Sequence, residues 1–176
     1  MTAENKLEKI KADIFSDDWD KIKNATNHLF NLGGKENIDY LLGLLDHKDS
    51  SIRNAVALTF RDNKFNEAVE PLFKSINKEE NKNYRGTMVY ALQMLDCSHK
   101  LQEIFKLLFY GNYEVKMGVL TILEEQKFEF TKDDLIVIQN MWADFNTNPY
   151  NYPNHEGMKD LIHGNVEGYL SYLKNK

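Results

Sequence analysis

The sequence predicts an all-α protein in which about four helical pairs stack as a solenoid, with N- and C-terminal capping helices. Two observations carry this prediction. Apolar residues recur at offsets of three, four, seven and eight in successive segments, which places them on one face of successive helices. The same columns of residue types then recur at intervals of 30, 32 and 31 residues. A pair of short amphipathic helices cannot cover its own apolar face, so each pair needs neighbours of the same kind.

The repeat is clearest in residues 49–76, where two amphipathic segments flank the polar stretch 61–66. An apolar anchor, Ile52, is followed at once by a basic residue. A small residue lies three positions after the anchor and allows the paired helix to come close, and a large apolar residue lies five positions further on. The four columns are Ile22, Ile52, Tyr84 and Val115; Lys23, Arg53, Arg85 and Lys116; Ala25, Ala55, Thr87 and Gly118; and Phe30, Phe60, Leu92 and Leu123.

The basic column has two interpretations. In the functional one, its four cations form a stripe that contacts anions along the repeats. In the structural one, each cation bonds carboxylates or carbonyl groups in the adjacent repeat turn. The structural interpretation is favoured, because Asp49 and the asparagines recur in that turn.

We expect one domain over residues 1–176, since the chain is long enough to bury a continuous core and its 42% hydrophobic and 28% charged residues are typical of globular proteins. An N-terminal cap helix is expected within residues 1–17 and four helical repeats within residues 18–142. The remaining residues, 143–176, are expected to form an irregular loop and a C-terminal cap.

Helix boundaries are predicted from residues that cap backbone groups. Asp or Asn recurs three positions before the anchor in three repeats, which predicts helix N-caps. Thr131, with Asp134 three positions on, predicts an N-cap for the last repeat helix. Gly33 and Gly34 end the first repeat helix and permit a sharp turn. The three N-cap residues of the repeats are Asp49, Asn81 and Asn112.

Helical periodicity stops after Trp142, and residues 143–157 contain two prolines and four asparagines. We therefore expect an irregular, extended stretch there, followed by a helical tail that folds back as a cap. A second interpretation makes Tyr150 and Tyr152, on a loop between prolines, part of a recognition edge, because tyrosines on loops are frequent binding anchors.

The segments 44–60 and 67–76 resemble the short HEAT-like repeat of the phycobilin-lyase type, over about residues 18–123. The resemblance implies a right-handed α-α superhelix and an architectural role for the basic column. The matching residues are Asp49, Ile52, Arg53, Ala55, Ala68, Val69, Pro71 and Leu72.

Composition limits the classes of function. The net charge of −5 is opposite to the basic footprint that nucleic-acid binding needs, and it favours a basic protein partner. The charged start and the absence of long apolar runs predict a cytoplasmic protein that binds no membrane. The single Cys97 allows no internal disulfide. No motif of catalytic, cofactor-binding or metal-binding residues is recognisable, so we expect neither an enzyme nor a cofactor.

The favoured function is a non-enzymatic binding module, monomeric when free, that uses the exposed side of the second helices. Its small size and acidity suggest an immunity or inhibitor protein that neutralises a basic toxin. The outward positions expected on the second helices are Asp39, Tyr40, Gly43, Glu70, Lys74, Gln102, Glu103 and Lys106, to which the recognition edge adds Tyr150 and Tyr152.

Two alternatives stay open. HEAT-like folds occur in alkylpurine DNA glycosylases, and Trp19, or Trp142 with Asp144, would then form a base pocket. The acidic balance, the missing basic groove and the short chain count against this alternative. An accessory role in chromophore attachment rests on the repeat family alone. Two acidic clusters, which helix N-termini explain in part, are Asp13, Asp17, Asp18 and Asp20, and Glu124, Glu125, Glu129, Asp133 and Asp134.

Overall fold

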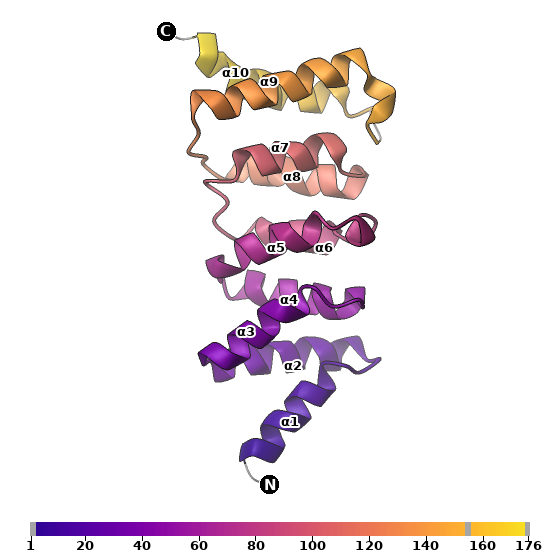
Figure 1. Ribbon diagram of the computed structural model, residues 1–176, viewed down its shortest axis with the longest axis vertical. Coiled ribbons are helices and arrows are strands. Elements are labelled where there is room, and N and C mark those ends of the chain that lie inside the picture. Colours follow the sequence, from indigo (N-terminus) through magenta and orange to yellow (C-terminus); the bar gives the residue numbers. More distant parts are fainter. Residues whose placement is uncertain (1–2, 154–155, 175–176) are drawn as a thin grey trace. The chain divides into compact units, whose positions relative to one another are not determined.

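The computed structural model describes residues 3–153 and 156–174 (Figure 1). Within these residues the chain forms helices and no strand, which confirms the all-α prediction for the part of the chain described. The ten α-helices are α1 (Ala3–Asp13), α2 (Trp19–Leu32), α3 (Lys35–Leu44), α4 (Ser50–Asp62), α5 (Val69–Ile76), α6 (Gly86–Leu92), α7 (Leu101–Tyr110), α8 (Tyr113–Glu125), α9 (Lys132–Thr147) and α10 (Lys159–Lys174). Short 3-10 helices span Asn66–Ala68, Glu79–Asn81 and Pro149–Asn151.

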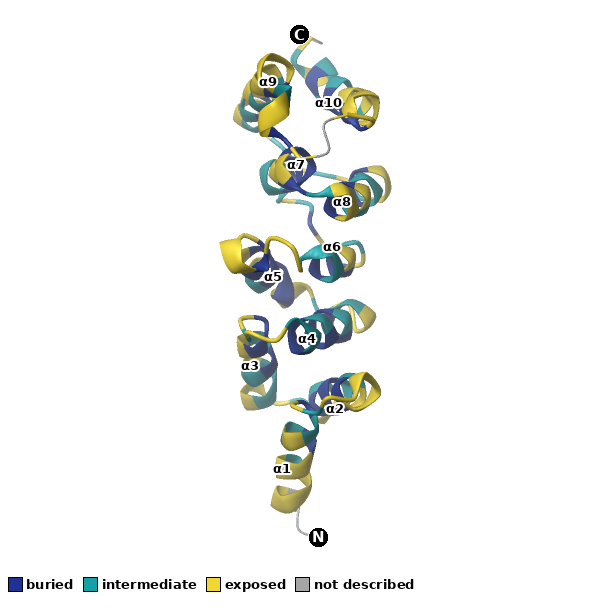
Figure 2. Ribbon diagram, turned by 90° about the vertical axis from the view of Figure 1, so that its right-hand side faces the viewer, coloured by how far each residue is buried: buried dark blue, intermediate teal, exposed yellow. Residues whose placement is uncertain are grey.

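The chain divides into two compact units, which we call the first unit (Met1–Leu95) and the second unit (Asp96–Lys176). In both, helices contact mostly their neighbours in the sequence. In the first unit, α2 packs on α4 and α4 on α6, while α3 and α5 lie on one side of this row (Figure 2). In the second unit, α7 packs on α8 and α9, and α10 packs on α9.

The small column was expected to let the paired second helix come close, but Ala25 and Ala55 lie on α2 and α4, the first helices of successive pairs, which pack on each other. Ala25 and Ala55 are both buried. Close by, the hydroxyl groups of Thr26 and Thr59 are hydrogen-bonded to each other at 2.9 Å, so the contact also satisfies two buried polar groups. A larger side chain at either alanine would push the helices apart.

Most of the predicted helix boundaries are confirmed. The carboxylate of Asp49 accepts a hydrogen bond from the backbone N–H of Ser51, and the amide oxygen of Asn112 accepts one from Val115. Thr131 and Asp134 form a capping box at the start of α9. Gly33 and Gly34 both have positive φ, 65° and 81°, which glycine adopts without strain.

The third repeat begins differently from the prediction. Asn81 is not the cap of a helix: its side chain is buried and donates hydrogen bonds to the carbonyl and hydroxyl oxygens of Ser75. These bonds hold the 3-10 turn Glu79–Asn81 against the end of α5, and α6 starts only at Gly86. Tyr84 therefore lies before the helix and is exposed, unlike the buried anchor Ile52.

The structural interpretation of the basic column is confirmed for Arg53, Arg85 and Lys116. Nη1 of Arg53 donates to the carbonyl oxygens of His47 (2.7 Å) and Lys48 (2.9 Å), just after α3. Nη1 of Arg85 donates to the carbonyl of Ile76 at the end of α5 (3.5 Å).

The ammonium group of Lys116 donates to the carbonyl oxygens of Leu108 (2.9 Å) and Phe109 (2.8 Å) in the last turn of α7. Each of these cations thus satisfies carbonyl groups at or just beyond the end of the preceding helix, where intrahelical partners run out. Burial lowers the pKa of Arg53 and Arg85, and lowers that of Lys116 to about 8.

The second unit has an aromatic core around Phe109. The ring of Phe109 lies 5.7 Å from that of Phe145 and 6.4 Å from that of Trp142, between centroids. Phe145, three positions after Trp142, is buried, and α9 continues to Thr147. The expectation of an irregular stretch from residue 143 is therefore wrong for its first five residues, 143–147. Pro149 follows shortly after and disfavours helix in the residue before it.

Candidate functional site

A groove of about 450 Å³ lies between α3 and α5 in the first unit; we call it the α3–α5 groove. Its apolar lining comes from Leu42, Leu45 and Pro71. Its charged lining comes from Asp46, Glu70 and Lys74. An apolar floor with a charged rim is the usual anatomy of a protein–protein contact.

The amphipathic pattern of the two helices places these side chains. In α5, Leu72, Phe73 and Ile76 are buried, so Glu70 and Lys74, four residues apart, lie on the opposite, exposed face. The ammonium of Lys74 lies 3.9 Å from the carboxylate of Asp46, across the groove.

Gly43 keeps the groove open on the side of α3. A Cβ atom at this position would meet no other atom within 4 Å. Gly43, Glu70 and Lys74 were all expected to face outward, and the structure brings the three together in one groove. Leu42 and Asp46 were not predicted as site residues. They lie three and seven positions after the outward Asp39, so helical spacing could have identified them as outward residues.

Asp39 and Tyr40 lie on α3 near its start. Asp39 is exposed and pairs with Lys35 one turn away, at 2.5 Å. Tyr40 is half-buried, and the ammonium of Lys11 on α1 lies 5.2 Å from the centre of its ring. Burial raises the pKa of Tyr40, and the neighbouring Glu8 adds to this effect. Tyr40 therefore contacts α1 as well as facing outward.

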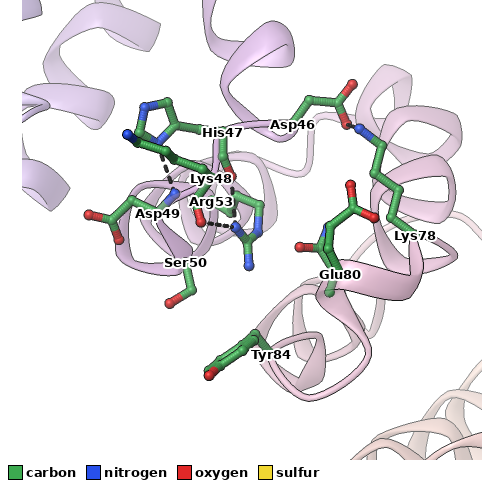
Figure 3. Close-up of a pocket in the computed structure, with 10 residues that line it drawn as sticks. Asp46, His47, Lys48, Asp49, Ser50, Arg53, Lys78, Glu80 and Tyr84 are labelled. Carbon is green, nitrogen blue, oxygen red and sulfur yellow. Dashed lines mark hydrogen bonds and ion pairs between the residues drawn. The ribbon is translucent and has the colours of Figure 1, made fainter.

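A second pocket of about 500 Å³ lies beside the groove, at the turns after α3 and α5 (Figure 3). Asp46 lines both. In this pocket its carboxylate accepts the ammonium of Lys78 at 2.8 Å. Arg53 is held against the carbonyls of the α3–α4 turn, while Glu80 and the exposed Tyr84 complete the lining.

Charges in this pocket are nearly balanced, and several of them are engaged within the chain. Burial lowers the pKa of Arg53, and the carboxylates of Asp49 and Glu80 oppose that effect. The imidazole Nδ1 of His47 accepts the backbone N–H of Asp49 at 3.1 Å. These hydrogen bonds and the ion pair between Asp46 and Lys78 fix the two turns, and they set the position of Asp46 on the rim of the α3–α5 groove.

Three predicted residues lie on α7 in the second unit. Gln102 is half-buried, and its amide donates a 2.6 Å hydrogen bond to the carboxylate of Asp134, which joins α7 to α9. Glu103 lies 3.5 Å from the ammonium of Lys100. Lys106 is exposed, as expected. Spacing along α7 could not reveal the contact of Gln102, because its partner is 32 residues away.

The two tyrosines of the expected recognition edge have opposite environments. Tyr150 is 86% exposed, whereas Tyr152 is 2% exposed. The ring of Tyr152 packs against Tyr110 and Phe145 at 5.0 and 5.1 Å between centroids, and its hydroxyl donates to the carboxylate of Asp144. The expectation that Tyr152 is an exposed anchor is therefore wrong, because the loop turns this side chain into the aromatic core.

Trp142 and Asp144 of the suggested base pocket are each engaged with other residues of the second unit. The indole of Trp142 is stacked on Phe145 and on His163, each 5.5 Å away. Asp144 accepts hydrogen bonds from Tyr152 and Asn148, and these bonds lower its pKa. Trp19 belongs to the first unit.

No protein-family model matches the chain, and no curated protein matches it. Among residues 3–153 and 156–174, no helix combines the length and the apolar character that crossing a membrane requires. Of the features in the first unit, the α3–α5 groove unites the largest number of sequence-predicted binding residues, and it is the candidate site.

Proposed function

We propose that the protein is a non-enzymatic protein-binding module of the HEAT-like solenoid type, and that its α3–α5 groove docks a basic protein partner. Most concretely, we propose an inhibitor or immunity-type protein that neutralises a basic toxin. The observation that carries the proposal is the groove itself, with the apolar Leu42, Leu45 and Pro71 inside and charged groups at the rim.

The solenoid arrangement is supported by the repeated construction of the helical pairs. Within each unit, helices contact mostly their sequence neighbours. The same basic position satisfies carbonyl groups at or just beyond the ends of α3, α5 and α7, at Arg53, Arg85 and Lys116. A structural device that recurs with the sequence period is typical of repeat proteins, which present extended binding surfaces.

A basic partner is supported by charge. The chain has 27 acidic and 22 basic residues, so its field attracts and orients a positively charged protein at a distance. Close to the groove, Asp39, Asp46 and Glu70 lie on the helices and turn that line it or adjoin it, and Lys74 lies among them, 3.9 Å from Asp46. Such steering acts on the association rate and weakens as salt rises.

The proposal is tested by reversing one charge at the groove and one elsewhere. Glu70 and Glu114 are matched, since each is exposed and each lies in the first turn of its helix, α5 and α8. A partner captured from native lysate would be identified, and its association with the Glu70→Lys and Glu114→Lys variants measured by surface plasmon resonance at several salt concentrations.

We expect Glu70→Lys to slow association by about tenfold at low salt and to flatten the salt dependence, because rim charges act mainly on the on-rate. Glu114→Lys should change association much less, although the change in net charge is the same. Both variants should keep their stability within about 0.5 kcal/mol, as exposed charges contribute little to folding. Equal association rates for the two variants would place the docking surface elsewhere.

A further inference from the structure

A pocket of about 610 Å³ in the second unit lies between the α8–α9 connection and α10. Four aromatic rings line it: Phe128 and Phe130 from the connection, and Tyr169 and Tyr172 from α10. We call these four residues the aromatic cage. The function proposed above makes no use of them.

Three pairs of rings in the aromatic cage meet edge to face. The ring of Phe130 makes angles of 72° with Tyr169 and 73° with Tyr172, at centroid distances of 5.6 and 5.3 Å. Phe128 and Tyr169 meet at 73° and 6.3 Å. In contacts of this kind the positive edge of one ring lies on the negative face of the other, so the rings are held at fixed angles around the pocket that they line.

A buried ring anchors the cage. Phe105, which is fully buried, meets Tyr169 edge to face at 5.4 Å and fixes its ring. Burial raises the pKa of Tyr169 to about 12, and the neighbouring Tyr172 adds to this effect. Gly164 and Gly168, one turn apart on α10, also line the pocket, and a Cβ atom at either would meet nothing within 4 Å.

The sequence segment that carries Phe128 and Phe130 is rich in acidic residues. Residues 124–134 contain five acidic side chains, Glu124, Glu125, Glu129, Asp133 and Asp134, and two basic ones, Lys127 and Lys132. Lys127 lines the pocket itself and is the cation that opposes a positive ligand there. In the sequence, Glu129 comes between the two phenylalanines of the cage. It does not line the pocket, and its carboxylate lies 3.6 Å from the imidazole of His99.

We propose that the aromatic cage binds a guanidinium group, presented by an arginine of the protein partner; the source of that arginine rests on the function proposed above. Ring faces attract cations, and a pocket lined by four aromatic rings offers a cation more than one ring to contact. A guanidinium is planar, stacks on aromatic faces and is more weakly hydrated than an ammonium, so it enters such a pocket at lower cost. The acidic residues of 124–134 supply long-range attraction.

The test uses a small probe and does not need the partner. The full chain, labelled with ¹⁵N, would be titrated with N-acetyl-arginine methylamide and, separately, with N-acetyl-citrulline methylamide, which has nearly the same shape but no charge. We expect the arginine probe to shift the amide signals of Phe130, Gly164 and Gly168 at millimolar concentrations. The citrulline probe should bind about two- to fivefold more weakly, the factor that a partly exposed cation–π contact provides.

Two variants show which rings produce the preference for the arginine probe. Tyr172→Leu keeps an apolar side chain but removes a ring face, and it should abolish the preference for the arginine probe. Tyr113→Leu on α8 is the matched control, because Tyr113 and Tyr172 are 58% and 63% exposed. This control should bind both probes as the wild type does.

Equal binding of the two probes, or the absence of shifts at the cage, would overturn the inference. The preference for arginine surviving in Tyr172→Leu would overturn it as well. None of these outcomes bears on docking at the α3–α5 groove, which the Glu70→Lys variant tests in the other unit. Conversely, an ineffective Glu70→Lys change would leave the probe titration unaffected.

Discussion

The free energy of unfolding of the second unit is expected to rise with pH, relative to that of a Lys116→Met variant, between about pH 8 and pH 10.5. Lys116 is fully buried, and burial lowers the pKa of its amine from 10.5 to about 8. Between these two values the unfolded chain binds a proton that the folded chain has released. Stability therefore increases with pH across this window, by on the order of 3 kcal/mol in total.

The comparison with Lys116→Met isolates this effect from an opposing one. Burial raises the pKa of the Cys97 thiol from 9.0 to about 12, so Cys97 lowers stability as pH rises above 9. That loss is the same in the wild type and in the variant, and it cancels in the difference. Methionine fills the space of the lysine stem without a charge, which keeps the comparison free of a large cavity.

Unfolding by urea at pH 7, 8, 9 and 10 would measure the difference. In a Trp19→Phe background, the remaining Trp142 reports on the second unit, because it is stacked on Phe145 and His163. A difference between wild type and Lys116→Met that stays constant over this range would contradict the buried, titrating amine.

Tyr152→Ala is expected to lower the free energy of unfolding of the second unit by about 3–5 kcal/mol, the usual cost of removing a buried ring. Its ring lies 6.3 Å from Phe109 and 5.1 Å from Phe145, and its hydroxyl is bonded to Asp144. Tyr150→Ala, two residues away, should change stability by less than about 0.5 kcal/mol, since Tyr150 is exposed.

The same urea titration, followed by Trp142 fluorescence, measures both variants. Tyr152→Phe separates the two contributions: it keeps the ring and should cost only about 1–2 kcal/mol for the hydrogen bond to Asp144. Equal and small effects of the two alanine variants would mean that Tyr152 is exposed in solution, as the sequence alone suggested.

Much of the fold could be predicted because it depends on local physics. Helical spacing identifies the buried face of each helix, and caps such as Asp49 and Thr131 act within three residues of themselves. The basic column was predictable for the same reason, since Arg53 and Lys116 bond carbonyls only five to eight positions away.

The failure at the third repeat occurs where a competing side-chain contact overrides a capping preference. Asn81 has a good capping side chain, but it bonds Ser75 and holds a 3-10 turn instead. Nothing in a helical spacing distinguishes Asn81 from Asn112, which does cap its helix. The position of Tyr84 outside α6 follows from that one difference.

The candidate site shows the same division. Gly43, Glu70 and Lys74 were found because outward positions of a helix follow from its buried ones. The aromatic cage was missed, because about 40 residues separate Phe130 from Tyr169 and only the return of α10 brings the rings together. Composition could show that the region is aromatic, but not that its rings line one pocket.

Docking on the α3–α5 groove is tested most directly by filling the groove. Gly43→Tyr places a ring in its open side, and since a Cβ atom there meets nothing within 4 Å, the helix should tolerate the change or gain from losing a glycine. Asn24→Tyr, at an exposed position of α2 outside the groove lining, is the matched control.

The measurement is capture of the basic partner by each variant, at equal concentrations and with thermal unfolding recorded in parallel. We expect Gly43→Tyr to weaken binding by at least about tenfold while Asn24→Tyr binds normally, because a blocked groove excludes the partner's side chains. Normal capture by Gly43→Tyr, with its stability unchanged, would contradict docking at this groove.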